Sequence, residues 1–226
     1  MRFLEAVWLI VHKDLLIEVR SREILYTTVF FAVSTVLVFA FGFVREGRAA
    51  EEAAPAIMWV AIAFSGTLAL GRAFERERQH ETLRGLLMAP IERPALYVGK
   101  LAGILLLMAA VEAVLVPLVA LLFQAQVFAH PLLLLGLLVA GTLGFAAVGT
   151  LFAAMLVRSR SRDVLLPVLL YPITVPVIIA GVRGTAALLQ AEADVPVARA
   201  WLSMLVFFDA VFITLALWTF EAVMTE

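Results

Sequence analysis

The sequence FSGTLALGRAFERERQHETLRGLLMAPIERPALYVGKL, residues 64–101, lies between two long apolar segments and is rich in Arg and Lys. A loop this basic between two membrane spans is retained on the cytoplasmic side of the membrane. The stretch therefore predicts a chain that crosses a membrane more than once, with this loop in the cytoplasm.

The first half of this loop is expected to continue the preceding span as a polar helix. Its charged residues alternate in sign at three-residue steps, which favours weak ion pairs along one face, and an apolar patch then follows at helical spacing. We interpret the segment as a stiff cytoplasmic lever that docks on a partner; the alternative is a solvated loop that contributes only positive charge. The residues expected to contact the partner are Glu75, Arg76, Glu77, Arg78, His80, Glu81, Leu83, Arg84, Leu86 and Leu87.

The composition indicates a membrane protein. Of its 226 residues, 64% are hydrophobic and only 15% are charged, whereas a soluble domain is closer to half apolar. The net charge of −1 argues against nucleic acid as a partner. With no cysteine, the chain forms neither disulfides nor thiolate metal sites. We expect one membrane domain over residues 1–226, without a separate soluble domain or a cleavable signal.

Six apolar segments approach the length of about 20 residues that a helix needs to cross a bilayer. Their expected limits are residues 24–43, 56–70, 101–123, 132–157, 164–182 and 201–220, and the cytoplasmic segment occupies residues 71–100. The fold class is therefore predicted to be an all-α membrane protein with six transmembrane helices. In the fourth segment, Ala140 and Gly144 form a small-xxx-small pair that lets helices approach closely.

Two further segments are expected to meet the membrane without crossing it. Residues 1–23 place apolar side chains at helical spacing between charged ones, which is typical of an interfacial helix, with Trp8 at the interface. The alternative is a short cytoplasmic helix packed on the rest of the protein. Residues 183–200 contain both apolar and charged residues. One interpretation of this stretch is a short helix that enters the outer leaflet without crossing the membrane.

The distribution of basic residues predicts the orientation. With the N-terminus inside, thirteen of the seventeen Lys and Arg residues lie in cytoplasmic segments. This asymmetry places both termini in the cytoplasm.

Nucleotide hydrolysis within this chain is excluded by its motifs. The Gly99-Lys100 pair is preceded by Pro94 where a phosphate-binding loop needs its first glycine, and Leu101 replaces the Ser or Thr that binds magnesium.

The histidines do not predict a metal site. His12 and His80 are expected inside and His130 outside. His130 is either an ordinary loop residue or a ligand to an outward-moving group such as a haem iron. No catalytic, cofactor-binding or metal-binding residue is therefore predicted in the chain.

Two acidic residues, Glu112 and Asp209, lie near the middle of predicted spans. A charged group at the bilayer centre is costly and usually turns inward, pairs or is protonated. The functional hypothesis gives both residues a part in substrate passage or conformational coupling. The alternative is that each is protonated or hydrogen-bonded to a neighbouring helix and holds the bundle together.

The fifth span contains Pro167, Pro172 and Pro176. Each proline removes a backbone donor and bends a helix, which is tolerated where neighbouring groups or a cavity satisfy the freed carbonyls. We interpret this span as a kinked helix that lines a cavity or acts as a gate, with a static kink required for packing as the alternative.

Three motifs, with the order of the segments, resemble one family. They are KDLLIEVRSRE (residues 13–23), the basic stretch over residues 64–100, and LLPVLLYPITVPVIIAG (residues 165–181). The chain resembles the haem exporter protein B family of the cytochrome c maturation system, whose fold is the type-2 ABC exporter permease.

The resemblance implies a permease subunit, not an enzyme, that works as a homodimer in the bacterial inner membrane. A separate cytoplasmic ATPase would bind ATP and receive the coupling helix, which maps here to residues 75–88. A membrane haem-handling subunit would be a further partner. The four tryptophans are widely scattered and form no haem platform, so haem is expected either as the exported ligand or on a chaperone released by ATP-driven motion. The rivals are an ABC-2 permease for a lipid or drug and a non-transporting assembly subunit.

Overall fold

A computed structural model describes residues 3–42, 48–74, 92–127, 129–157, 159–190 and 192–223, with only the backbone at residues 48–51 and 221–223. Within these ranges the chain forms seven α-helices. They are α1 (Phe3–Ser21), α2 (Glu23–Gly42), α3 (Arg48–Arg72), α6 (Arg93–Phe123), α7 (Pro131–Met155), α8 (Arg162–Leu188) and α9 (Val195–Val223). Six of them, α2 to α9, are long and apolar enough to cross a membrane.

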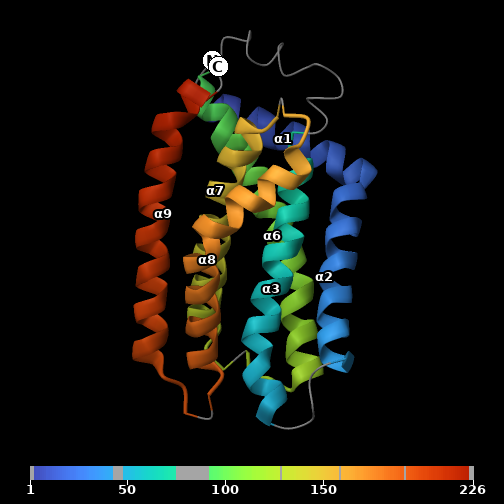
Figure 1. Ribbon diagram of the computed structural model, residues 1–226, viewed down its shortest axis with the longest axis vertical. Helices are drawn as coiled ribbons and strands as arrows, with labels where there is room; N and C mark the ends of the chain where they lie inside the picture. The colour runs from blue at the N-terminus through green and yellow to red at the C-terminus, as the bar shows by residue number, and fades with distance from the viewer. Residues whose placement is uncertain are drawn as a thin grey trace.

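The six candidate spans run side by side along the long axis of the molecule (Figure 1). Helix α1 lies across the end of this bundle at which both chain termini are found (Figure 1), and it packs mainly against α6. In the core, α7 contacts α3, α6, α8 and α9, and most of its residues are buried.

Several helices extend further than the hydropathy pattern predicts. Helix α3 begins at Arg48 and α6 at Arg93, whereas the apolar segments suggested residues 56 and 101. Helix α6 has 31 residues, which corresponds to about 46 Å against a hydrocarbon core of about 30 Å. Hydropathy detects only the part inside the core, whereas the helix continues outside it because its backbone hydrogen bonds remain favourable there.

The described residues of the range 183–200, which are 183–190 and 192–200, do not form a separate re-entrant helix. Residues 183–188 are the last turns of α8, and α9 begins at Val195. The small residues Gly184 and Thr185 are buried and continue the packed face of α8, so this stretch extends two long helices with a short connection between them.

The centre of the bundle is organised around Trp59 of α3. Its side chain is 2% exposed, and its indole N–H donates a hydrogen bond of 3.0 Å to Oγ1 of Thr185 on α8. A Cβ atom at Gly141 of α7 would lie 2.2 Å from the ring, and one at Gly181 of α8 would lie 2.4 Å from it. The indole therefore fills the space that these two glycines leave open and joins three helices.

The same arrangement of a large side chain against a glycine recurs along α7. Leu70 of α3 occupies the space at Gly149, where a Cβ atom would lie 2.2 Å away. Phe208 and Asp209 of α9 lie against Gly144, the second residue of the predicted small-xxx-small pair. Small residues permit this close approach, which is a main source of helix association in lipid.

Helix α8 is continuous from Arg162 to Leu188 although it contains Pro167, Pro172 and Pro176. It changes direction along its length: its first part crosses the bundle obliquely and its second part runs with the other spans (Figure 1). Whether this helix gates a passage stays a prediction.

The tight packing at Trp59 predicts that Gly141→Ala destabilises the protein. The added methyl group cannot be accommodated without moving the buried indole, and overpacking of this kind costs about 1–3 kcal/mol. The measurement is the thermal unfolding of the detergent-purified protein.

The matched control for this change is Gly71→Ala near the end of α3, where a Cβ atom would meet nothing within 4 Å. Alanine also favours helix more than glycine by up to about 1 kcal/mol, so this variant should be unchanged or slightly more stable. Equal unfolding temperatures for the two variants would contradict the tight packing of Trp59 against Gly141.

Candidate functional site

The ten residues predicted to contact a partner all lie in residues 75–91, outside the described residues. Both ends of this segment are described. Helix α3 ends at Arg72, followed by Ala73 and Phe74, and α6 begins at Arg93. The contacts of these two ends define how the segment is attached to the rest of the protein.

The first end is joined to α2 by an ion pair. The Nη1 atom of Arg72 lies 2.8 Å from Oε1 of Glu23, and both side chains are largely exposed to the surroundings. Such an exposed pair contributes about 0–1 kcal/mol. It fixes the position of the end of α3 beside the start of α2 more than it stabilises the fold.

The second end is joined to α1 by a buried ion pair. Lys100 on α6 is only 3% exposed, and its Nζ atom lies 2.9 Å from Oδ2 of Asp14. The same ammonium donates a 3.1 Å hydrogen bond to the carbonyl oxygen of Ala73 and lies 5.3 Å from the ring centroid of Phe74. Because an isolated buried charge is very costly, Lys100 ties α1, the end of α3 and α6 together.

This position of Lys100 differs from the sequence prediction, which counted it in the cytoplasmic segment 71–100. Helix α6 already begins at Arg93, so Lys100 lies within the helix and faces the protein. The acidic partner, Asp14, also lies close to Lys13, with 3.1 Å between Nζ and Oδ1.

The corner between α1 and α2 is closed by Glu18 and Arg22. The backbone N–H of Leu25 donates to Oε1 of Glu18 at 2.8 Å, which satisfies a free donor in the first turn of α2. Arg22 adopts the left-handed backbone conformation with φ of 55°, and its backbone N–H donates to the carbonyl oxygen of Glu18 at 2.6 Å. The hydrogen bond between Arg22 and the Tyr26 hydroxyl raises the pKa of the guanidinium above its ordinary value.

The two predicted intramembrane carboxyl groups lie on different sides of α7. The hydroxyl of Thr142 on α7 donates to Oε1 of Glu112 on α6. Asp209 of α9 lies against Gly144 of α7, and its Oδ1 has no hydrogen-bond partner among the described residues. Positions two apart on an α-helix point about 200° apart, so Glu112 and Asp209 do not form a pair with each other.

Both carboxyl groups are buried in the bundle, 9% exposed for Glu112 and 6% for Asp209. Glu112 bridges α6 and α7 through its hydrogen bond, while Asp209 packs α9 on α7. The choice between passage, coupling and a structural role stays open for both residues.

Among the described residues, no three His, Asp or Glu side chains are arranged to hold a metal ion. His12 stacks on Trp8, with ring centroids 5.8 Å apart, and His130 directly precedes the first turn of α7. The sequence did not predict the contact between Trp59 and Thr185 or the ion pair between Asp14 and Lys100. Each joins side chains on elements that are far apart in the chain.

The described fold is that of a multi-pass helical membrane subunit, in which a charged segment is attached to the membrane domain through ion pairs at both of its ends. Residues 5–225 match the protein family described as CcmB protein. The chain belongs to this family. It is the permease subunit of the cytochrome c maturation ABC transporter, and ATP hydrolysis resides in a separate chain.

Three curated relatives, each described as "Heme exporter protein B", are similar over most of their length. The protein of Pseudomonas aeruginosa is 27% identical over 171 residues, which is 76% of each chain. That of Haemophilus influenzae is 28% identical over 170 residues, 75% of this chain and 76% of its own. That of Paracoccus denitrificans is 32% identical over 155 residues, 69% of this chain and 70% of its own.

The buried ion pair predicts that Asp14→Asn destabilises the protein strongly. The substitution leaves the ammonium of Lys100 in a protein interior without its carboxylate, and breaking a buried pair costs about 3–5 kcal/mol. Glu23→Gln is the matched control, because it removes the carboxylate of an exposed pair and should cost about 0–1 kcal/mol. Thermal unfolding of the two purified variants measures the difference, and similar losses in both would contradict the role assigned to Lys100.

Proposed function

We propose that this permease subunit couples ATP hydrolysis by its partner ATPase to haem export, or to the release of haem-loaded chaperone, in the bacterial inner membrane. The observation that carries the proposal is the family match over residues 5–225, together with three bacterial relatives described as heme exporter protein B. Both termini lie in the cytoplasm in this proposal, as the basic residues predict.

The ATPase binds the segment over residues 71–100 in this proposal. The segment has an apolar patch at Leu83, Leu86 and Leu87 beside a row of alternating charges. Burial of the patch would provide affinity at roughly 25 cal/mol per Å², and the charges would mainly set orientation.

The attachment of this segment supports its role as a lever. Its first end is held to α2 through Arg72 and Glu23, and its second end to α1 through Lys100 and Asp14. A displacement of residues 75–91 is therefore passed to the corner of α1 and α2 as well as directly to α3 and α6. From α3 it reaches α7 and α8 through the buried ring of Trp59.

The proposal includes a homodimer and a second membrane partner. Six spans are half of the complement of a complete transporter of this type, so two copies would act with two ATPase subunits. Trp59 is not exposed for stacking on a haem, because its ring is packed between Gly141 and Gly181. This observation favours a haem-handling membrane partner and the release of haem-loaded chaperone over a haem platform built on this tryptophan.

The lever predicts that Leu86→Asp abolishes binding of the ATPase while the permease still inserts into the membrane. A carboxylate at the centre of the apolar patch would have to lose its hydration on docking, without a partner that compensates. The measurement is co-purification of the ATPase with the tagged permease in mild detergent, together with the amount of permease in the membrane fraction.

Leu86→Met is the control at the same position, since it preserves the apolar surface and a similar volume. This variant should retain the ATPase. An ATPase that co-purifies equally with both variants would refute docking at this patch, and normal cytochrome c maturation with a catalytically inactive ATPase would instead favour the assembly subunit.

The proposed orientation predicts the accessibility of introduced cysteines, and the chain offers a background with no cysteine. Ser161→Cys, in the connection between α7 and α8, should react only with a thiol reagent that enters the cytoplasm. Gln190→Cys, between α8 and α9, should react with an impermeant reagent added outside. Both side chains are exposed, so protection is due to the membrane, and the reverse pattern would invert the topology.

A further inference from the structure

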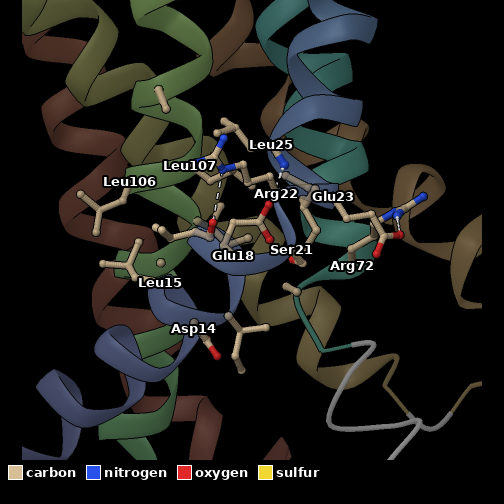
Figure 2. A pocket seen from close by; sticks show the side chains of 18 of the residues that line it. Asp14, Leu15, Glu18, Ser21, Arg22, Glu23, Leu25, Arg72, Leu106 and Leu107 are labelled. Carbon is tan, nitrogen blue, oxygen red and sulfur yellow. Dashed lines mark hydrogen bonds and ion pairs between the residues drawn. The ribbon is translucent and has the colours of Figure 1, made fainter.

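A cavity of about 1020 Å³ lies at the corner of α1 and α2, and its wall also includes the end of α3 and the first half of α6. Figure 2 shows its lining, with charged side chains of α1 and α2 beside Leu106 and Leu107 of α6. The cavity thus has a charged part and an apolar part. Neither the docking of an ATPase nor the packing at Trp59 gives this space a role.

The charged part has an excess of positive charge. Within the described part of the chain, seven charged side chains line the cavity: Lys13, Arg22, Arg72, Lys100, Asp14, Glu18 and Glu23. Asp14 lies between two of the cations, and Glu23 pairs with Arg72.

Arg22 is the cation in this lining whose side-chain hydrogen bonds go to neutral groups. It donates to the carbonyl oxygen of Val19 at 3.3 Å and to the hydroxyl of Tyr26 at 3.1 Å. Among the described residues no carboxylate lies within ion-pair distance of its guanidinium. The guanidinium of Arg22 can therefore donate hydrogen bonds to an anion. The spacing of phosphate oxygens matches the paired N–H groups of a guanidinium well.

The apolar part extends from Leu25 on α2 to Leu106, Leu107 and Ala110 on α6. Leu106 is 48% exposed. In a membrane these side chains face acyl chains, not water. A ligand that fills the whole cavity therefore carries an anionic head and an apolar tail.

The position of α1 places this cavity at the level of the lipid headgroups. Helix α1 crosses the end of the bundle (Figure 1) and presents several large apolar side chains to its surroundings. They are Leu4, Trp8, Leu9, Leu16 and Val19. Apolar exposure on a helix that also carries charges is typical of the membrane interface.

We propose that the cavity binds one phospholipid, with its phosphate at Arg22 and its acyl chains along Leu25, Leu106 and Leu107. Such a lipid lies against α1, α2 and α6. The ion pair of Asp14 with Lys100 and that of Glu23 with Arg72 connect these helices to the two ends of the proposed lever. Haem also combines carboxylates with an apolar body, but among the described residues the lining contains no His, Met or Cys, and Tyr26 already binds Arg22. Haem proteins hold the iron through such side chains.

The test measures lipid binding to the delipidated full-length permease in complex with its ATPase, by native mass spectrometry. Phosphatidylglycerol is the probe. Diacylglycerol, which lacks the phosphate, and inorganic phosphate, which lacks the chains, are the two chemical controls. One phosphatidylglycerol should bind each permease chain at least about tenfold more tightly than diacylglycerol, as expected for a charge-assisted interaction, and inorganic phosphate should not displace it.

Two variants locate the site. Arg22→Asn removes the cation while keeping a residue that tolerates the left-handed backbone, and it should weaken phosphatidylglycerol binding about tenfold. Ala110→Trp fills the apolar part and should abolish binding. The matched controls are Arg160→Asn, an exposed arginine outside the lining, and Ala109→Trp, an exposed neighbour outside it; both should bind as the unchanged protein does.

Several outcomes would overturn the proposal. Equal binding of diacylglycerol would show an apolar groove without phosphate recognition, and displacement by inorganic phosphate would show a simple anion site. Displacement by haem would assign the cavity to haem. Unchanged binding in both Arg22→Asn and Ala110→Trp would place the bound lipid elsewhere. None of these readouts depends on haem export, so they do not test the proposed function.

Discussion

The ring of Trp59 fills space that two other helices leave empty, and the arrangement of the membrane domain depends on this contact. Gly141 on α7 and Gly181 on α8 leave no room for a Cβ atom beside the indole, and the hydrogen bond to Thr185 fixes the direction of the ring. In lipid, helices gain little from hydrophobic association and depend on close packing and specific hydrogen bonds. One tryptophan that satisfies both conditions for three helices therefore determines how α3, α7 and α8 are placed.

At the end of the bundle near the termini, the helices are held together by ion pairs and hydrogen bonds. There, the ammonium of Lys100 is buried with Asp14, the carbonyl of Ala73 and the ring of Phe74 around it. A buried charge with this many partners is costly to displace. The α1–α3–α6 corner is therefore stiff. The exposed pair of Arg72 and Glu23 positions the end of α3 beside the start of α2 but contributes little to the stability of the fold.

Sequence reasoning predicted the membrane class, the six spans and the family, because a run of about 20 apolar residues and a basic loop are local signals. It placed the limits of several helices too narrowly, since helices such as α6 continue beyond the apolar run. It missed the partners of Lys100 and Trp59, which depend on how distant helices meet. A weak signal for the first was available: Lys100 follows the start of a proline-initiated helix by two turns and is then followed by residues 101–111, which carry no charge. The predicted lever lies in residues 75–91 and stays a prediction.

In the proposed coupling to an ATPase, the packed core and the charged corner would together carry the response of this permease. In the proposed coupling, force applied to residues 75–91 would reach the α1–α2 corner as well as α3 and α6, because Arg72 on α3 pairs with Glu23 on α2 and Lys100 on α6 pairs with Asp14 on α1. The displacement would then travel along α3 and α6. Trp59 joins α3 to α7 and α8, and the hydrogen bond between Thr142 and Glu112 joins α6 to α7, so both contacts could pass the displacement on. Helix α7 is joined to both routes, so in this proposal its position relative to the bent α8 would be the coordinate on which ATP-driven motion acts.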